Sequence, residues 1–153
     1  MPTDPIRLSP EERDVAAAEV EAVLALAQPG EYRERLERLA PALGEPELDA
    51  ESAEELDTLL GLALQSGRVR ALYGPGGEQA ALRLYRRLPT GAGVAASARE
   101  VSEALGALRG RELDGASIQA VGPGAFSLTL RAGGVDVAVR LDRQGARLAT
   151  VEV

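Results

Sequence analysis

The sequence lacks cysteine, histidine, lysine, tryptophan and asparagine altogether. Without cysteine it forms neither a disulfide nor a zinc–thiolate site, and without histidine it has no imidazole base or metal ligand. Without lysine it offers no Schiff-base amine and no phosphate-loop lysine. Any catalysis would depend on Asp, Glu, Tyr, Ser, Thr or Arg. These absences favour a non-enzymatic protein without a metal or cofactor, with an enzyme as the alternative.

Long hydrophobic runs are missing as well. The opening Met-Pro-Thr-Asp-Pro is polar and does not resemble the apolar core of a secretory signal peptide. The apolar stretches inside the chain are shorter than the roughly 20 residues that a membrane-spanning helix needs. We therefore expect a cytoplasmic protein that does not bind membranes.

The chain has 153 residues, of which 45% are hydrophobic and 27% are charged. This is the size and composition of one globular domain with a sizeable core. Apolar residues recur with helical spacing up to residue 109 and at every second position from residue 113. The sequence therefore predicts a single α+β domain over residues 1–153. A helical part at 9–109 precedes a four-stranded antiparallel β-meander at 113–153, and helices should cover one face of the sheet.

Capping signals predict the first three of about five helices. Ser9, followed by Pro-Glu-Glu, is typical of a capping box with proline in the first helical turn. Pro29-Gly30 ends this first helix, and Pro41 should end or kink the second. The third helix should begin near Asp49 and end at Gly67, a preferred residue for a helix C-terminus.

The next signals predict where the later helices are separated. The Gly-Pro-Gly-Gly run at residues 74–77 should break the chain before a fourth helix. Pro89 should end that helix, because proline lacks an amide hydrogen. Residues 90–96 should form a connection of small residues, and a fifth helix should continue to Leu108.

Turn chemistry predicts the register of the meander. Gly133-Gly134 suits a two-residue hairpin turn. This turn sets Leu130 opposite Val137 on the core face and Arg131 opposite Asp136 on the outer face, where the two charges can pair.

The last hairpin is predicted with a three-residue turn at residues 143–145. This turn places Leu148 on the outer face. Separately, Phe126 alternates in step with Leu128 and Leu130 and so has the parity of the core face. Because the chain ends on strand periodicity, the last strand should form a sheet edge that can pair with another chain. The predicted pairs across the last hairpin are Val139 with Ala149, Val137 with Val151 and Val135 with Val153.

Charge is distributed unevenly. Residues 1–65 contain 5 Arg and 16 acidic residues, a net charge of −11, whereas residues 66–153 contain 12 Arg and 8 acidic residues, a net charge of +4. Three interpretations stay open. The two parts complement each other within or between subunits, the basic part binds an anion, or the acidic helices bind a basic protein. The first is favoured as the usual arrangement of a mixed charged surface.

Two sets of residues are candidate sites. The first is an anion site that combines a Gly-rich loop with arginines, which contact phosphate or carboxylate in a bidentate manner; it matches no phosphate-binding fingerprint. The second is a pocket containing tyrosines. Both sets also fit a structural interpretation, as a solvated helix face and as core packing. The anion candidates are Arg68, Arg70, Arg83, Arg86, Arg87, Gly76 and Gly77, and the pocket candidates are Tyr32, Tyr73 and Tyr85.

The sequence thus favours a non-catalytic interaction or assembly module that self-associates, most simply as a homodimer. One alternative is a cone-shaped α+β domain that binds a small molecule or carries out a simple reaction. The other is a binder of anions or nucleic acid through residues 68–87. Nucleic acid is disfavoured because aromatic side chains are scarce among the basic residues.

Overall fold

The computed structural model describes residues 4–153 and consists of five helices followed by a four-stranded antiparallel sheet. The predicted α+β class and the order of its elements are confirmed. The chain divides into two compact units, residues 1–92 and 93–153. We call them the helical unit and the sheet unit and describe each separately. Whether they share one core, as a single domain requires, stays a prediction.

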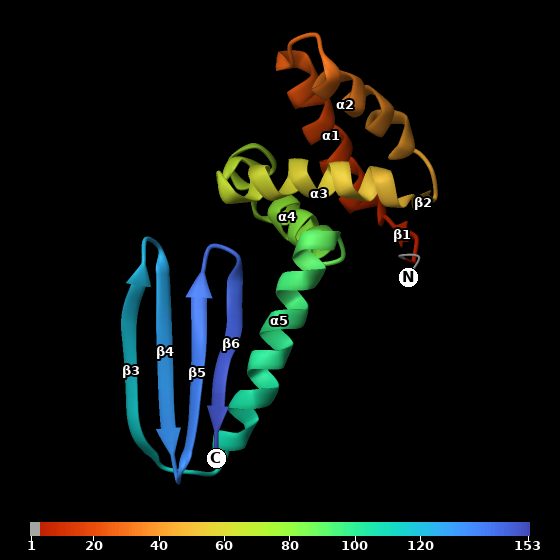
Figure 1. Ribbon diagram of the computed structural model, residues 1–153. Coiled ribbons are helices and arrows are strands. Elements are labelled where there is room, and N and C mark those ends of the chain that lie inside the picture. Colours follow the sequence, from red (N-terminus) through yellow and green to blue (C-terminus); the bar gives the residue numbers. More distant parts are fainter. Residues whose placement is uncertain (1–3) are drawn as a thin grey trace. The chain divides into compact units, whose positions relative to one another are not determined.

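The helical unit is a bundle of four helices and a small strand pair (Figure 1). The strand pair was not predicted; it joins β1 to β2 with Ile6 opposite Leu48. The helix α5 (Pro89–Leu105) begins in this unit and crosses its boundary. The other elements are β1 (Ile6–Arg7), α1 (Pro10–Leu26), α2 (Glu31–Ala42), β2 (Glu47–Leu48), α3 (Ala50–Gln65) and α4 (Arg68–Tyr85).

The predicted helix starts are confirmed by their caps. The Ser9 hydroxyl accepts from the Glu12 amide at 3.2 Å, and the Glu12 carboxylate accepts from the Ser9 amide at 2.9 Å. This is the reciprocal capping box. Asp49 accepts from the Ser52 amide at 2.8 Å. That hydrogen bond lowers the pKa of Asp49, because it stabilises the carboxylate. At the end of α3, Gly67 adopts the left-handed conformation.

The expected break at residues 74–77 is present inside α4: Gly74, with φ 70° and ψ −174°, is non-helical and separates two helical segments that meet at a kink. A later prediction, the connection of small residues at 90–96, is wrong. The helix α4 ends at Tyr85, before Pro89 as expected, but Pro89 then begins α5, so the expected connection at 90–96 is helical. The reason is a distant cap: Asp57 on α3 accepts from the Thr90 amide at 3.0 Å and from its hydroxyl at 2.6 Å.

Leucine dominates the core of the helical unit. Leu56 and Leu60 on α3 are fully buried, and Val20 on α1 and Leu84 on α4 are 1% exposed. They belong to one cluster that draws on every helix from α1 to α4. Burial of a leucine side chain stabilises by about 1.5–3 kcal/mol. The helical unit therefore has a substantial core of its own.

The sheet unit has strand order β3-β4-β5-β6, so β3 and β6 are its edges. The predicted hairpin register is confirmed: Leu130 pairs with Val137, and Arg131 pairs with Asp136, with Nε–Oδ2 at 3.1 Å. A short 3₁₀ turn at Gly106–Leu108 follows α5. The strands are β3 (Leu113–Gly122), β4 (Ala125–Ala132), β5 (Val135–Asp142) and β6 (Gly145–Glu152).

The last hairpin differs from its predicted register. Gly145 pairs with Asp142, so the turn has two residues instead of three, and Val139 pairs with Leu148 instead of Ala149. A bulge after Leu148 then restores the expected pair of Val137 with Val151. Leu148 therefore lies on the inner face, packed with the core, and not on the outer face. Ladder pairing on β6 ends at Glu152, so the expected partner of Val135 falls outside the strand.

One side of the sheet packs against the end of α5 (Figure 1). Val101 of α5 is buried with Val135, Val137 and Val139 of β5. The partly buried residues around them come from all three of the later strands and from residues 104–108. The helix thus covers the part of the inner face that surrounds β5.

Candidate functional site

The arginines of the predicted anion site lie along α4 and the two residues that follow it, and four of the five face acids of α1 or of α4 itself. Arg87 donates to Glu12, and Arg68 lies 3.4 Å from Glu19. These pairs supply the neutralising charge within the helical unit, so the basic segment complements the acidic helix beside it. The remaining pairs are Arg70 with Glu78 at 3.8 Å and Arg83 with Glu11 at 3.6 Å, while Arg86 is the C-cap of α4.

The two glycines of the predicted anion site lie just after the kink in α4. A Cβ at Gly77 would come within 2.4 Å of the Tyr73 Cβ, so close packing of the helix explains this glycine. Both glycines line a shallow hollow of about 790 Å³ that includes Glu11 and Asp14 on α1. Its lining holds three carboxylates and one arginine, Arg83, so its net charge is negative and does not favour an anion.

The three candidate tyrosines occupy different places. Tyr32 is 42% exposed and lies 5.8 Å from the Arg35 guanidinium carbon. Tyr73 donates to Glu19 at 3.0 Å. Tyr85 packs close to Gly61 of α3. Burial raises the pKa of Tyr85, and the neighbouring Asp57 charge adds to this effect. They do not form one tyrosine-lined pocket.

A groove of about 310 Å³ between α1, α2 and α3 brings Tyr32 close to the buried acid Glu19. Leu62, 63% exposed, forms part of its wall. Glu19 is only 1% exposed; one oxygen accepts from Tyr73 and the other faces Arg68. Burial raises the pKa of Tyr73, and its hydrogen bond to Glu19 adds to the shift. Since both oxygens already have partners, Glu19 acts as an anchor between α1 and α4.

Sequence reasoning missed the buried acids. Glu12 and Glu19 are 5% and 1% exposed and lie seven residues apart on the buried stripe of α1, beside Ala16 and Val20. The sequence alone shows that this spacing places two charged residues on the apolar face of the helix. Buried charges are normally paired, and a search for arginine partners would have led to α4.

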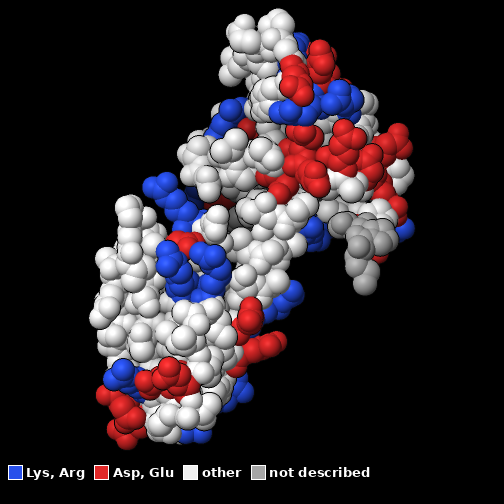
Figure 2. All heavy atoms as spheres, in the orientation of Figure 1, with Lys and Arg blue, Asp and Glu red and all other residues white. Residues whose placement is uncertain are grey.

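The net charges differ from those of the sequence halves when they are counted over the two structural units. The helical unit, residues 1–92, holds 10 Arg and 17 acidic residues, so it carries the net charge of −7. The sheet unit holds 7 Arg and 7 acidic residues and is neutral. The basic segment at 66–92 belongs to the helical unit, which the division at residue 65 had obscured. Figure 2 shows acidic side chains gathered over the helical unit. A neutral unit has no net repulsion against a second copy of itself.

The inner face of the sheet is apolar beyond the part that α5 covers. Cross-strand pairing places Ile118, Leu128, Val139 and Leu148 in one row across all four strands, and Phe126 in the next. Val139 is 2% exposed, but Ile118 is 60% and Phe126 43% exposed. Phe126 thus has the predicted parity without being buried. We call the exposed part the β3–β4 strip: Ala116, Ile118, Ala120 and Phe126.

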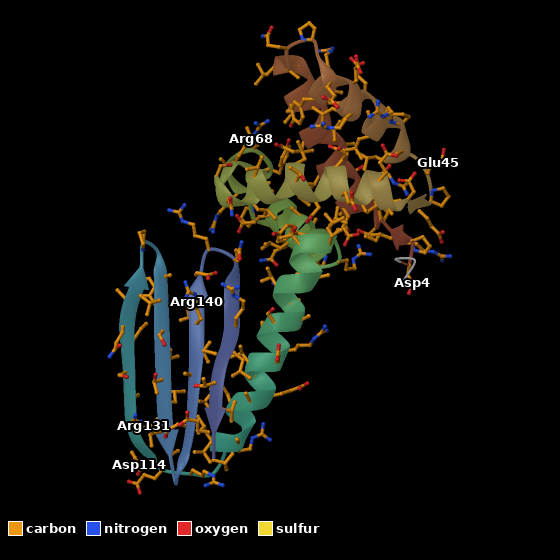
Figure 3. All side chains as sticks on the ribbon, in the orientation of Figure 1. Asp4, Glu45, Arg68, Asp114, Arg131 and Arg140 are labelled. Carbon is orange, nitrogen blue, oxygen red and sulfur yellow. The ribbon has the colours of Figure 1, made fainter. Side chains whose placement is uncertain are left out.

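Charges within the sheet segregate along the strands. Between Leu113 and Glu152, the end with the 143–144 turn holds three Arg and one Asp, whereas the opposite end holds one Arg and three acids. Figure 3 places Arg140 near the first end and Asp114 and Arg131 near the second. The basic end contains Arg140, Asp142, Arg143 and Arg147, and the acidic end contains Asp114, Arg131, Asp136 and Glu152. Arg111, just before β3, donates to the Gly133 carbonyl at 2.8 Å and adds one positive charge to the acidic end, where the charges of the strands still outweigh it.

Asp142 organises the basic end. Its carboxylate accepts from the Gln144 amide at 2.9 Å and from Arg147 at 2.5 Å. The amide hydrogen bond is the main cause that lowers the pKa of Asp142, and Arg147 and Arg140 add to it. Asp142 therefore stays ionised and holds the Gln144 amide of the turn and the flanking Arg140 and Arg147 in place.

In the part of the chain that the structure describes, no group of three or more acidic side chains is placed to hold a metal ion. Within the same residues, no helix has the length and hydrophobicity to cross a membrane. No protein-family model matches the sequence, and neither the curated proteins nor the solved structures contain a significant match to it.

Proposed function

We propose that the protein is a non-catalytic assembly module that self-associates through its sheet unit. The observation that carries this proposal is the β3–β4 strip, where Ile118 and Phe126 are exposed on the face whose other part packs under α5. Exposed, contiguous apolar surface on a soluble unit is typical of an interaction site. The neutrality of the sheet unit supports a second copy as the partner.

The acids and tyrosines of the helical unit support a structural role more than a chemical one. Glu12, Glu19 and Asp57 are buried, and each accepts hydrogen bonds from partners in the same unit. A catalytic acid or base needs a proton-transfer path to a substrate. These carboxylates instead join α1 to α4 and α3 to the start of α5.

The test is light scattering coupled to size exclusion on the full chain, at low and high salt and over a range of protein concentrations. We expect a dimer that persists at high salt, because apolar burial is not screened by ions. A charge introduced in the strip by Ile118→Glu should convert it to a monomer. The matched control is Thr129→Glu, which places the same charge on the opposite face of the neighbouring strand.

A wild-type chain that is monomeric throughout would overturn self-association. A dimer that Ile118→Glu leaves intact would overturn the assignment of the β3–β4 strip. Circular dichroism of each variant separates loss of assembly from loss of folding, because the variants should keep the wild-type spectrum.

A further inference from the structure

We infer that two copies pair through their β3 edges, antiparallel and about a two-fold axis at Ile118, to form one continuous eight-stranded sheet. This inference rests on the proposed self-association and names its geometry. It depends on three features of the sheet unit: which backbone groups of β3 point outward, which side chains lie beside them, and how charge is arranged along the strands.

The first feature is the set of free backbone groups. The two-residue turn at Gly133-Gly134 closes on Ala132 and Val135, a pair that is hydrogen-bonded in a β-turn. Hydrogen-bonded pairs alternate along an antiparallel ladder, so even-numbered residues of β4 bond to β5 and odd-numbered residues bond to β3. In β3, residues 115, 117 and 119 consequently bond to β4, while residues 116, 118 and 120 direct their amide and carbonyl groups to the open edge.

The second feature is the character of that edge. Register shifts interrupt β3 only near its two ends, so residues 115–120 form a regular stretch, and no charged residue lies within it. Charge, bulges and short length are the devices that protect sheet edges from pairing. The opposite edge, β6, has a bulge near its middle and carries Arg147 and Glu152. The contrast favours β3 as the edge that pairs.

The third feature is continuity of the apolar face. The residues with outward backbone groups, Ala116, Ile118 and Ala120, have their side chains on the same face as Phe126. In an antiparallel pair about Ile118, that residue faces Ile118 of the second copy, and Ala116 faces Ala120 of the second copy. The two β3–β4 strips then join into one apolar surface at the centre of the eight-stranded sheet.

Charge at the sheet ends selects the antiparallel direction. A two-fold axis normal to the sheet sets the basic end of one copy beside the acidic end of the other, whereas parallel pairing would bring like ends together. Asp114 would face Gly122 of the second copy. Arg143 lies close to that turn, since its Nε is 3.6 Å from where a Cβ of Gly124 would stand. Opposite charges therefore meet at both ends of the paired strands.

The experiment uses the absence of cysteine, because one introduced thiol is then unique. In the proposed register Ser117 faces Gln119 of the second copy as a non-hydrogen-bonded pair, with Cα atoms about 4.5 Å apart. Mixing Ser117→Cys with Gln119→Cys protein under mild oxidation should yield a disulfide-linked heterodimer, and neither variant alone should cross-link efficiently. Non-reducing electrophoresis and intact mass measure the product.

Two control variants with a single cysteine test which strand lies at the interface between the two copies. Thr129→Cys lies on the same face as Ser117 but one strand inward, so its two copies would be about 14 Å apart at a strand spacing near 4.8 Å, too far for a disulfide. Thr150→Cys reports the β6 edge. Cross-linking by Ser117→Cys alone would overturn the Ile118-centred register, and cross-linking by Thr150→Cys would overturn the choice of edge.

The two proposals fail in different ways. A dimer in light scattering with no cross-link from the β3 mixture would overturn edge pairing and leave self-association standing. That result is expected if two sheets stack through their inner faces, because residue 117 lies on the outer face. A monomer in light scattering would overturn both.

Discussion

The helical unit and the sheet unit differ in how many of their charged and apolar side chains find partners within the same unit. The helical unit carries all of the net charge and pairs most of its arginines with acids of the same unit. Its core is rich in leucine and draws on four helices. The sheet unit is neutral, with four buried residues in its core cluster, and its β3–β4 strip stays exposed. The comparison teaches that assembly is best sought in the unit whose apolar face is only partly covered.

The largest effect should come from the core of the helical unit. Leu60→Ala removes a fully buried side chain and should lower the free energy of unfolding by about 2–5 kcal/mol, from lost burial and a cavity. Urea unfolding followed by circular dichroism measures it. The control is Leu62→Ala on the same helix, 63% exposed, with an expected change within about 0.5 kcal/mol. Equal effects would refute the contrast between core and surface.

A smaller effect should come from the buried acid of α1. Tyr73→Phe removes the hydrogen bond to Glu19 and should cost about 1.5–3 kcal/mol near neutral pH, the range for a bond to a charged group. Tyr32→Phe, at an exposed position, is the control. A stability of Tyr73→Phe equal to wild type would show that Arg68 alone sustains Glu19.

The raised pKa of Tyr73 also predicts how the stability of the protein changes at alkaline pH. The pKa of Tyr73 is raised in the folded state, so its contribution is complete below the ordinary tyrosine value near 10 and is lost as pH rises through the folded value. With no lysine or cysteine in the chain, few other side chains titrate there. Urea midpoints should therefore fall more steeply above pH 10 for wild type than for Tyr73→Phe. Parallel curves would contradict this assignment.

The smallest effect should come from the basic end of the sheet. The pKa of Asp142 is lowered, so its contribution is present above the ordinary aspartate value near 3.9 and disappears as pH falls through the folded value. Asp142→Asn should make acid unfolding of the sheet less pH-dependent below pH 4, as followed by amide NMR signals of β5 and β6. Glu103→Gln, exposed on α5, is the control and should leave the acid profile unchanged.

Local signals predicted much of the fold because their partners are close in sequence. The Ser9 capping box spans four residues, and Gly133-Gly134 defines a hairpin whose register was confirmed. The predictions that failed concern features that the local sequence does not signal. Asp57 caps Thr90 across 33 residues and turns an expected connection into helix. The bulge after Leu148 has no turn signal, and it moved that leucine to the inner face.

The candidate site was less predictable than the fold. The arginines of α4 were identified, but their partners on α1 were not, because helix-to-helix pairing is not encoded in local spacing. The exposure of the β3–β4 strip could not be predicted from the sequence for a similar reason. Alternation shows that Ile118 and Phe126 share the inner face, but not that α5 packs around β5 and leaves them exposed.

The ion pairs described above are all built from arginine and carboxylate. Arginine stays protonated beyond pH 12, carboxylates ordinarily titrate near 4, and the chain has no histidine, cysteine or lysine between them. Its side-chain charge is therefore nearly constant from about pH 6 to pH 9. The protein has little buffering capacity in that range, and any assembly that it forms should be insensitive to physiological acidification.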